Sequence, residues 1–371
     1  PAAQDWWRLY RDPVLDRLIA DALASNTDIR VAVANIEKAR AGLRGSRAGE
    51  LPQTTLGASG TYSRLPESQR LPGAPQESWT VDTGLAVGYE VDLFGRVARD
   101  VQAASADLGA AQADAEAVKV VIVADTTRAY ADAASGAARL AVAHNIVDLL
   151  DRSLALTQRR HDAGLATGLD VAQIATLRDQ RAAQIPQIEA ERQAALFRLA
   201  TLTGKPPAEL PPVAADRQVS LEIAQPIPVG DGASLLARRP DIQAAERRLA
   251  AATARIGVAT ADLYPRITLG ASVGSTGAGL GDLFGAGPLR WLLGPLISWS
   301  FPNQEPARAR IAAAEADTKG RLAEFDGKVL GALEETEVAL SGYAHSLEQR
   351  RSLQSARDQA KRAADITQAQ L

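Results

Sequence analysis

The chain contains an internal repeat, and this repeat limits its possible folds more than any other feature of the sequence. Residues 26–59 and residues 239–272 begin and end with similar short motifs, and a helical run lies between the motifs in both copies. The offset between the copies is 213 residues at both ends. We therefore predict a first structural repeat over residues 1–203 and a second over residues 239–371, joined by a proline-rich linker over residues 204–238.

Each repeat also contains a very long segment without proline. In residues 96–161 and in residues 307–371, apolar or small side chains recur at alternating spacings of three and four. This heptad spacing is typical of helices that pack along one another in a coiled coil. We predict one helix over each segment, roughly 100 Å long at the helical rise of about 1.5 Å per residue. A return helix is predicted over about residues 169–202.

The composition fits helices that approach one another closely and excludes several classes of function. The chain is 46% hydrophobic but only 4% aromatic, and it has no Met and no Cys, so alanine, valine and leucine must fill most contacts. The absence of cysteine excludes thiol catalysis and cysteine-bound metals. A net charge of −3 gives no electrostatic basis for nucleic-acid binding. No apolar run approaches the roughly 18 residues of a membrane-spanning helix.

Residues 78–92 alternate between apolar and polar side chains with the period of a strand. Asp82 and Glu90 fall on one face. The other face carries Trp79, Val81, Leu85, Val87 and Tyr89. A long strand with aromatic residues near both ends is typical of a barrel strand whose apolar face contacts lipid. Asp82 and Glu90 would then line a lumen, although the wet face of a soluble sheet would show the same pattern.

Similar alternation predicts four strands in all, over about residues 54–64, 78–92, 266–275 and 290–301, with Trp291 and Trp299 on the apolar face of the last one. Four strands cannot close around a pore, and an open sheet edge is not tolerated in lipid, so several chains must contribute to one barrel. At the junction after residue 92, Gly95 permits a tight bend and Asp92 lies at a polar boundary.

Short motifs along the chain resemble those of a known family. They are Asp-Trp-Trp at residues 5–7, Tyr-Glu-Val-Asp-Leu-Phe-Gly-Arg at residues 89–96, Arg-Pro-Asp-Ile at residues 239–242 and Tyr-Pro at residues 264–265. In this order they closely resemble the outer-membrane efflux proteins, within the wider family of TolC-like outer-membrane factors. The first two motifs resemble the lipoprotein branch that serves resistance-nodulation-division pumps.

The resemblance implies a mainly α fold with β strands, in which a homotrimer forms a twelve-stranded β-barrel in the outer membrane and an α-helical barrel through the periplasm of a Gram-negative cell. It implies a passive exit duct for small molecules, whose partners are outer-membrane lipid, a periplasmic adaptor (membrane fusion protein) and an inner-membrane resistance-nodulation-division pump. Adaptor binding would favour a dilated packing of the helical barrel. A complete member would also have a second return helix, which the repeat offset would start beyond residue 371.

The first repeat turns between its two helices at residues 160–170. Gly164 can end one helix with a positive φ, and Thr167 with Asp170 forms a capping-box pattern that starts the next. Capping of the two helices is enough to explain these three residues without any binding function. The resemblance nevertheless implies that this tip contacts the adaptor, and we expect the contact to involve Arg159, Arg160, Gly164, Leu165, Thr167 and Asp170.

Other functions have less support in the sequence. A type I protein-secretion duct and a soluble periplasmic coiled-coil scaffold remain alternatives. We expect no enzyme, cofactor or metal site, because His144, His161 and His345 are isolated and have no ligand pattern around them. The glycine-rich residues 274–281 lack the Lys-Ser/Thr ending of a phosphate-binding loop.

Overall fold

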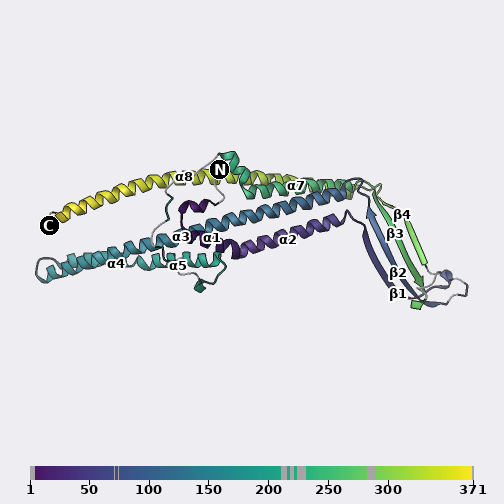
Figure 1. The fold of residues 1–371 in the computed structure, drawn as a ribbon, viewed down its shortest axis with the longest axis horizontal. Helices are drawn as coiled ribbons and strands as arrows, with labels where there is room; N and C mark the ends of the chain where they lie inside the picture. The colour runs from purple at the N-terminus through teal and green to yellow at the C-terminus, as the bar shows by residue number, and fades with distance from the viewer. Residues whose placement is uncertain are drawn as a thin grey trace. The chain divides into compact units, whose positions relative to one another are not determined.

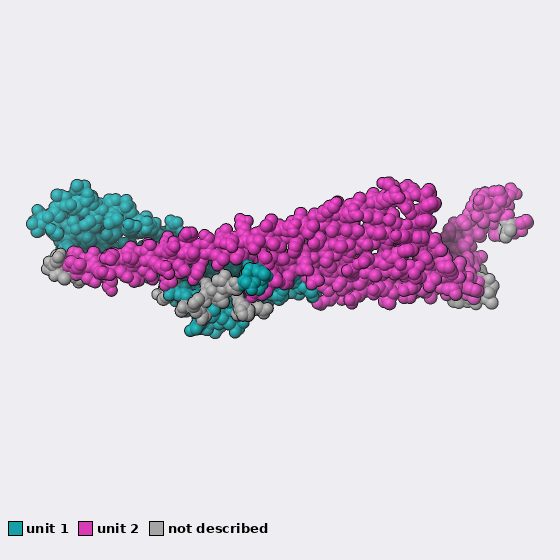
Figure 2. All heavy atoms as spheres, turned by 90° about the horizontal axis from the view of Figure 1, so that it is seen from above, with its two compact units in different colours: residues 1–38, 111–235 teal, residues 39–110, 236–371 magenta. Residues whose placement is uncertain are grey.

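A computed structural model of the chain describes residues 5–70, 72–73, 75–209, 215–217, 221–223, 231–281 and 289–369. Much of the predicted linker (residues 210–214, 218–220 and 224–230) and the predicted helix end at residues 370–371 lie outside the described residues. The chain divides into two compact units (Figure 2), residues 1–38 with 111–235 and residues 39–110 with 236–371. The units do not follow the repeat boundaries, because the strands of both repeats belong to the second unit.

Most of the described chain is helical (Figure 1). The helices are η1 (Trp6–Tyr10), α1 (Pro13–Ser25), α2 (Thr27–Ala48), α3 (Arg96–Asp162), α4 (Gly168–Ala182), α5 (Ile185–Leu202), α6 (Gly232–Arg238), α7 (Pro240–Ala261) and α8 (Glu305–Ala369), with short 3-10 turns η2 (Glu67–Gln69) and η3 (Pro207–Glu209). The two longest, α3 and α8, lie where the sequence predicts long helices. Among the described helices, none combines the length and the apolar character that crossing a membrane requires.

The prediction of one continuous return helix over residues 169–202 is wrong. The segment forms two helices, α4 and α5, which are separated at Ala183 and Gln184. Pro186 occupies the first turn of α5, where its missing N–H removes no helical hydrogen bond. Inside a continuous helix the same proline would lose a hydrogen bond and clash with the preceding turn, so the helix restarts there.

The first unit has a core formed by α1, the middle of α3 and the end of α5. Leu15, Ile19, Tyr130 and Leu199 are almost fully buried in it. Asp12 begins α1 by accepting hydrogen bonds from the N–H groups of the first turn, one of them at 2.8 Å from Val14. The hydroxyl of Tyr130 donates to the same carboxylate at 3.2 Å. Burial, and then the charge of Asp12, raise the pKa of Tyr130 to about 12, so the phenol stays a donor.

Asn26 joins two helices of the first unit. Its side-chain oxygen accepts the N–H groups of Asp28 at 2.8 Å and Ile29 at 3.3 Å at the start of α2, and its amide donates to the carbonyl of Leu202 at 3.0 Å. In the second repeat the corresponding residue is Arg239, which forms ion pairs with Asp241 and with Glu335 of α8. The two repeats therefore fix equivalent helix starts by different chemistry.

We expect Asn26→Ala to destabilise the first unit by about 2 kcal/mol, because it removes a helix cap and leaves a buried carbonyl without a donor. Asn26→Ser should cost about half of that, since serine keeps the cap but cannot reach Leu202. Thermal unfolding of the purified protein, with hydrogen exchange at the start of α2 and the end of α5, measures both variants. Equal losses for alanine and serine would show that the bond to Leu202 contributes nothing.

The second unit contains a four-stranded antiparallel sheet (Figure 1). Its strands are β1 (Gln53–Arg64), β2 (Glu77–Glu90), β3 (Arg266–Gly277) and β4 (Leu289–Ser298), in the order β1-β2-β3-β4. Leu56 pairs with Leu85, Leu85 with Val273, and Val273 with Trp291. Because directly paired residues point to the same side of a sheet, this register gives the whole sheet one apolar face.

The predicted last strand is too long at its C-terminal end. β4 ends at Ser298 rather than near residue 301, so Trp299 follows the strand instead of lying within it. The indole of Trp299 donates to the carbonyl of Leu263 at 3.1 Å and stacks on Phe301. The first contact joins the β4–α8 connection to the α7–β3 connection, and the second lies within the β4–α8 connection, so Trp299 packs at the junction rather than in a strand.

Small side chains fill the contact between α7 and α8. The buried residues of α7 include Ala244, Ala245, Ala251, Ala252 and Ala254, and α8 contributes Ala307 and Ala332. Alanine at these positions brings the two helix axes close together, as the composition indicates.

Candidate functional site

The sheet carries an apolar face that the described chain leaves exposed. Trp291 and Leu293, in the middle of β4, are each 75% exposed. By strand register the same face includes Leu56, Tyr62, Trp79, Val81, Leu85, Val87, Tyr89, Leu269, Val273 and Ile297. An exposed apolar surface that continues across four strands marks a site of interaction with a membrane or with another protein.

The opposite face of the sheet consists mainly of polar residues and glycines, apart from the exposed Leu292 and Leu296 of β4, and carries both acids that the sequence singles out. Asp82 accepts hydrogen bonds from Arg290, at 2.7 Å to each carboxylate oxygen, and from the hydroxyl of Thr276 at 2.7 Å. Glu90 is bound by Arg96 through two hydrogen bonds of 2.7 Å. Both acids lie where the alternation places them, but each is paired with an arginine. The alternating pattern does not reveal the partner of Asp82, since Arg290 is 208 residues away from it.

The two outer strands of the sheet each have an unpaired edge in the described chain. β1 pairs only with β2, and β4 pairs only with β3. Each free edge presents a row of backbone N–H and C=O groups that can pair with another strand. The sheet is therefore built to continue into a further strand on both sides.

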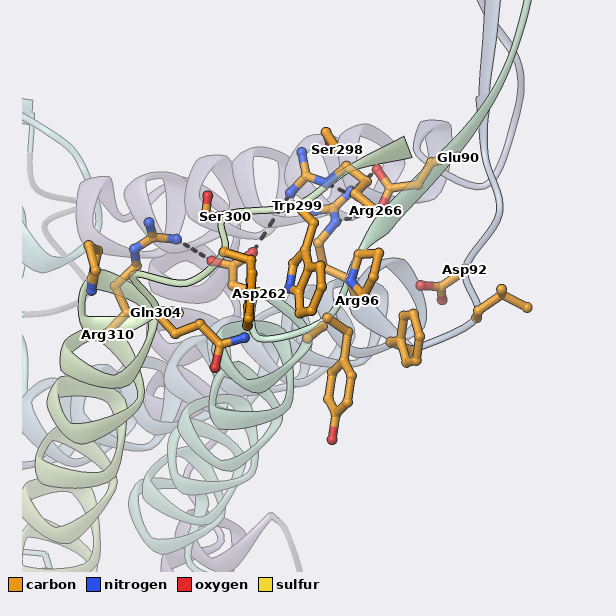
Figure 3. A pocket seen from close by; sticks show the side chains of 18 of the residues that line it. Glu90, Asp92, Arg96, Asp262, Arg266, Ser298, Trp299, Ser300, Gln304 and Arg310 are labelled. Atoms are coloured by element: carbon orange, nitrogen blue, oxygen red, sulfur yellow. Dashed lines mark hydrogen bonds and ion pairs between the residues drawn. The ribbon is translucent and has the colours of Figure 1, made fainter. Parts of the chain in front are cut away.

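A hollow of about 710 Å³ lies where the strands pass into helices (Figure 3). Arg266 lies 3.8 Å from Glu90 and 3.8 Å from Asp262, and Asp262 also pairs with Arg310. Together with the Arg96–Glu90 pair, these contacts form a row of alternating charges drawn from β2, β3, α3, α8 and the residue that follows α7. Every carboxylate in this row has an arginine partner, so the arrangement ties strand ends to helix starts.

The start of α3 confirms the predicted junction. The carboxylate of Asp92 accepts the N–H groups of Val97 at 3.0 Å and Ala98 at 2.8 Å, which caps the helix, and Gly95 has a φ of +75°. Phe94 stacks on Tyr264 with ring centres 4.6 Å apart. Aromatic side chains therefore gather at the level where the sheet ends.

The tip between α3 and α4 is a compact turn with two complete caps. The N–H groups of Gly164 and Leu165 donate to the carbonyls of His161 at 2.8 Å and Arg160 at 2.7 Å, the pattern of a Schellman cap. Gly164 has a φ of +73°, as this cap requires. Leu165 is 71% exposed. Leu169, a second exposed apolar residue four positions further on, is not among the tip residues expected from the sequence.

Thr167 and Asp170 form the predicted capping box. The carboxylate of Asp170 accepts the N–H of Thr167 at 2.8 Å and its hydroxyl at 2.7 Å, while the N–H of Asp170 donates to the hydroxyl oxygen at 3.2 Å. These hydrogen bonds, the backbone one first, lower the pKa of Asp170. The local roles predicted for Gly164, Thr167 and Asp170 are confirmed, and they hold the tip in one conformation.

We expect acid to loosen the first turn of α4. Because the folded pKa of Asp170 lies below the unfolded value of about 3.9, its cap stabilises the tip above that pH and is lost as the pH falls further towards the folded pKa. The protection factors of the amides at residues 168–171, which are exchange rates normalised to the intrinsic rate at each pH, should fall in this range. In Thr167→Ala the protection factors should already be low at neutral pH and change little with acid. Identical pH profiles for the two proteins would contradict the role of the box.

No group of three or more histidine, cysteine, aspartate or glutamate side chains is placed to hold a metal ion in the part of the chain that the structure describes. The charged clusters of the sheet and the junction are closed ion pairs rather than a nucleophile beside a base. In the described strands and at their junction, these ion pairs therefore stabilise the contacts between elements.

Comparison with known proteins agrees with this geometry. The family model for the outer membrane efflux protein matches residues 18–205 and 233–371. The outer membrane protein OprJ of Pseudomonas aeruginosa is 32% identical over 339 residues, which cover 91% of this chain and 70% of OprJ. The toluene efflux pump outer membrane protein TtgI of Pseudomonas putida is 32% identical over 332 residues, covering 90% of this chain and 70% of TtgI.

Solved structures show the same fold. The outer-membrane channel OprN superposes with a TM-score of 0.86 at 36% identity, covering 93% of this chain and 77% of OprN. The outer membrane protein VceC of Vibrio cholerae gives a TM-score of 0.80 at 28% identity, covering 90% of this chain and 79% of VceC. With these matches along nearly its whole length, the chain belongs to the outer membrane efflux protein family and is an outer-membrane efflux channel with the TolC-like fold.

Proposed function

We propose that three copies of this chain join their sheets edge to edge into a twelve-stranded barrel that serves as the passive exit duct of a tripartite efflux pump. The observation that carries this proposal is the two-faced sheet, with an exposed apolar side, a polar side of paired charges and two free edges. Closure in lipid requires every edge to be paired, and one chain supplies only four strands.

In this assembly the apolar face contacts outer-membrane lipid through Trp79, Val81, Leu85, Val87, Tyr89 and Trp291. Asp82 and Glu90 line the lumen on the opposite face. Trp299 lies just beyond the end of β4, beside Phe301, and so marks the edge of the membrane rather than its interior. Several relatives are named for efflux of toluene, solvents or antibiotics, which supports small molecules rather than proteins as the cargo.

Leu293 and Leu292 provide a matched test of the two faces, because they are neighbours on β4 that point to opposite sides and are 75% and 55% exposed. We expect Leu293→Arg to cost about 2–4 kcal/mol in the membrane and to abolish most trimer insertion, since it places a charge in lipid. Leu292→Arg, on the lumen side, should insert nearly as well as the unaltered chain.

The measurement is the amount of heat-resistant trimer in isolated outer membranes, after equal synthesis of each chain. If both variants accumulate to the level of the unaltered chain, the apolar face does not contact lipid. That result would favour the soluble coiled-coil scaffold.

We further propose that the tip contacts a periplasmic adaptor, and through it an inner-membrane resistance-nodulation-division pump. The capped turn holds Leu165 outward, beside the basic pair Arg159 and Arg160. A rigid apolar side chain with flanking cations suits docking against a partner hairpin. The alanine-rich seams of the long helices have shallow side-chain interdigitation, so adaptor binding can favour a dilated packing at modest cost.

Leu165→Glu should reduce efflux roughly tenfold or more, because it places a charge in the centre of the adaptor contact. Leu51→Glu is the control, since Leu51 is 63% exposed in the α2–β1 connection and belongs neither to the tip nor to the paired strands. The readout is accumulation of a fluorescent efflux dye in cells that lack their own outer-membrane channel and express the cognate pump and adaptor. Normal efflux by Leu165→Glu at normal trimer level would remove the tip from the adaptor contact.

A further inference from the structure

The side chain of Arg290 lies flat against the polar face of the sheet. Arg290 pairs with Gly274 in the strand register, Gly274 with Gly84, and Gly84 with Gly57, so a row of glycines crosses three strands beside it. A Cβ atom at Gly274 would lie only 3.4 Å from the Cζ atom of Arg290, and one at Gly84 would lie 3.7 Å from its Nη2 atom. Because these glycines have no side chains, the guanidinium of Arg290 can lie directly on the backbone of the sheet.

Two side chains from neighbouring strands hold the guanidinium of Arg290 against the glycine row. Its Nη2 atom donates to both carboxylate oxygens of Asp82 on β2, each at 2.7 Å. Its Nε atom donates at 3.2 Å to the hydroxyl of Thr276 on β3, and that hydroxyl donates to Asp82 at 2.7 Å. Residues of three strands thus form a closed triangle of charge-assisted hydrogen bonds, which fixes direction as well as charge.

These hydrogen bonds determine where the positive charge of Arg290 lies on the polar face of the sheet. The side chain of Arg290 is 53% exposed, so nothing in the described chain covers it on the side away from the sheet. If its partners were removed, this long side chain could extend away from the sheet. The other ionisable side chains of the polar face, Glu90 and Arg266, are also in ion pairs, with Arg96 and with Glu90 itself. Within the described strands, the wall therefore presents pairs of opposite charge rather than a field of one sign.

We infer that Asp82 and Thr276 are positioning residues that hold Arg290 against the wall of the lumen, so that the barrel passes solutes without selecting them by charge. This inference rests on the proposed function, in which the polar face lines the lumen. It assigns to the duct a cargo class that includes cationic, anionic and neutral small molecules. Release of the arginine would turn three copies of this site into a ring of guanidinium groups that favours anions.

The absence of cysteine from the chain allows a direct test. A cysteine introduced at Gly57 would sit on the polar face, across Gly84 from the arginine, and an added Cβ there meets no atom within 4 Å. The experiment compares the rates at which an anionic and a cationic methanethiosulfonate reagent modify this thiol in intact cells, each divided by the rate for a free thiol. The reagents enter from outside, so a constriction at the periplasmic end does not limit the reaction.

In the Gly57→Cys background we expect the normalised ratio of anionic to cationic rates to be close to one. Adding Asp82→Asn should raise the ratio roughly tenfold, since a unit charge about 7 Å away in water changes each rate roughly threefold in opposite directions. Adding Arg290→Gln to that variant should return the ratio to its starting value. Thr276→Val, which alters no charge, should raise the ratio severalfold, and Thr276→Ser should leave it unchanged because serine keeps the hydroxyl.

The charge-neutral variants separate positioning from net charge. If Asp82→Asn raises the ratio but Thr276→Val does not, net charge alone sets the ratio and the positioning role is overturned. An unchanged ratio in Asp82→Asn also overturns it. A thiol that reacts with neither reagent, in a chain where Leu293→Arg inserts normally, contradicts the proposed function itself, because the polar face would not line an aqueous lumen.

Discussion

The structure depends on the rule that a sheet in lipid must satisfy all of its backbone hydrogen bonds. The four strands satisfy each other internally and leave one free edge on β1 and one on β4. Among the described residues no further strand pairs with these edges, and in the proposed barrel the sheets of other copies of the chain would pair with them. In the proposed barrel a second requirement, contact of the outer side chains with lipid, would account for an apolar face that continues over all four strands.

The junction between strands and helices joins two different packing regimes. The sheet packs by strand pairing and presents large apolar side chains outward, whereas α7 and α8 pack through buried alanines such as Ala245 and Ala332. Between them, the charge row that includes Arg266 and Asp262 and the stack of Phe94 on Tyr264 fix the strand ends to the helix starts. In the proposed duct, such a junction would let the helices change their packing while the strand ends stay in place.

The sequence predicts local structure well wherever one residue pattern has only one physical explanation. The capping box of Thr167 with Asp170 and the positive φ of Gly164 are examples, because both depend on neighbours within a few residues. Predictions of where a helix or strand ends fail where the apolar periodicity continues past the point at which the element stops. Pro186 divides the return helix although the apolar spacing continues, and the alternation around Trp299 continues after strand pairing has ended.

By itself the sequence determined the repeat, the positions of the long helices and the two faces of the strands, since periodicity and offset are written along the chain. Only the tertiary structure decided which charges meet. Asp82 finds Arg290 because β3 lies between their strands, and Asn26 reaches Leu202 because α2 begins where α5 ends. Such partners are far apart in sequence, and no local pattern records them. Their distance in space follows from strand order and helix packing, which a one-dimensional pattern does not contain.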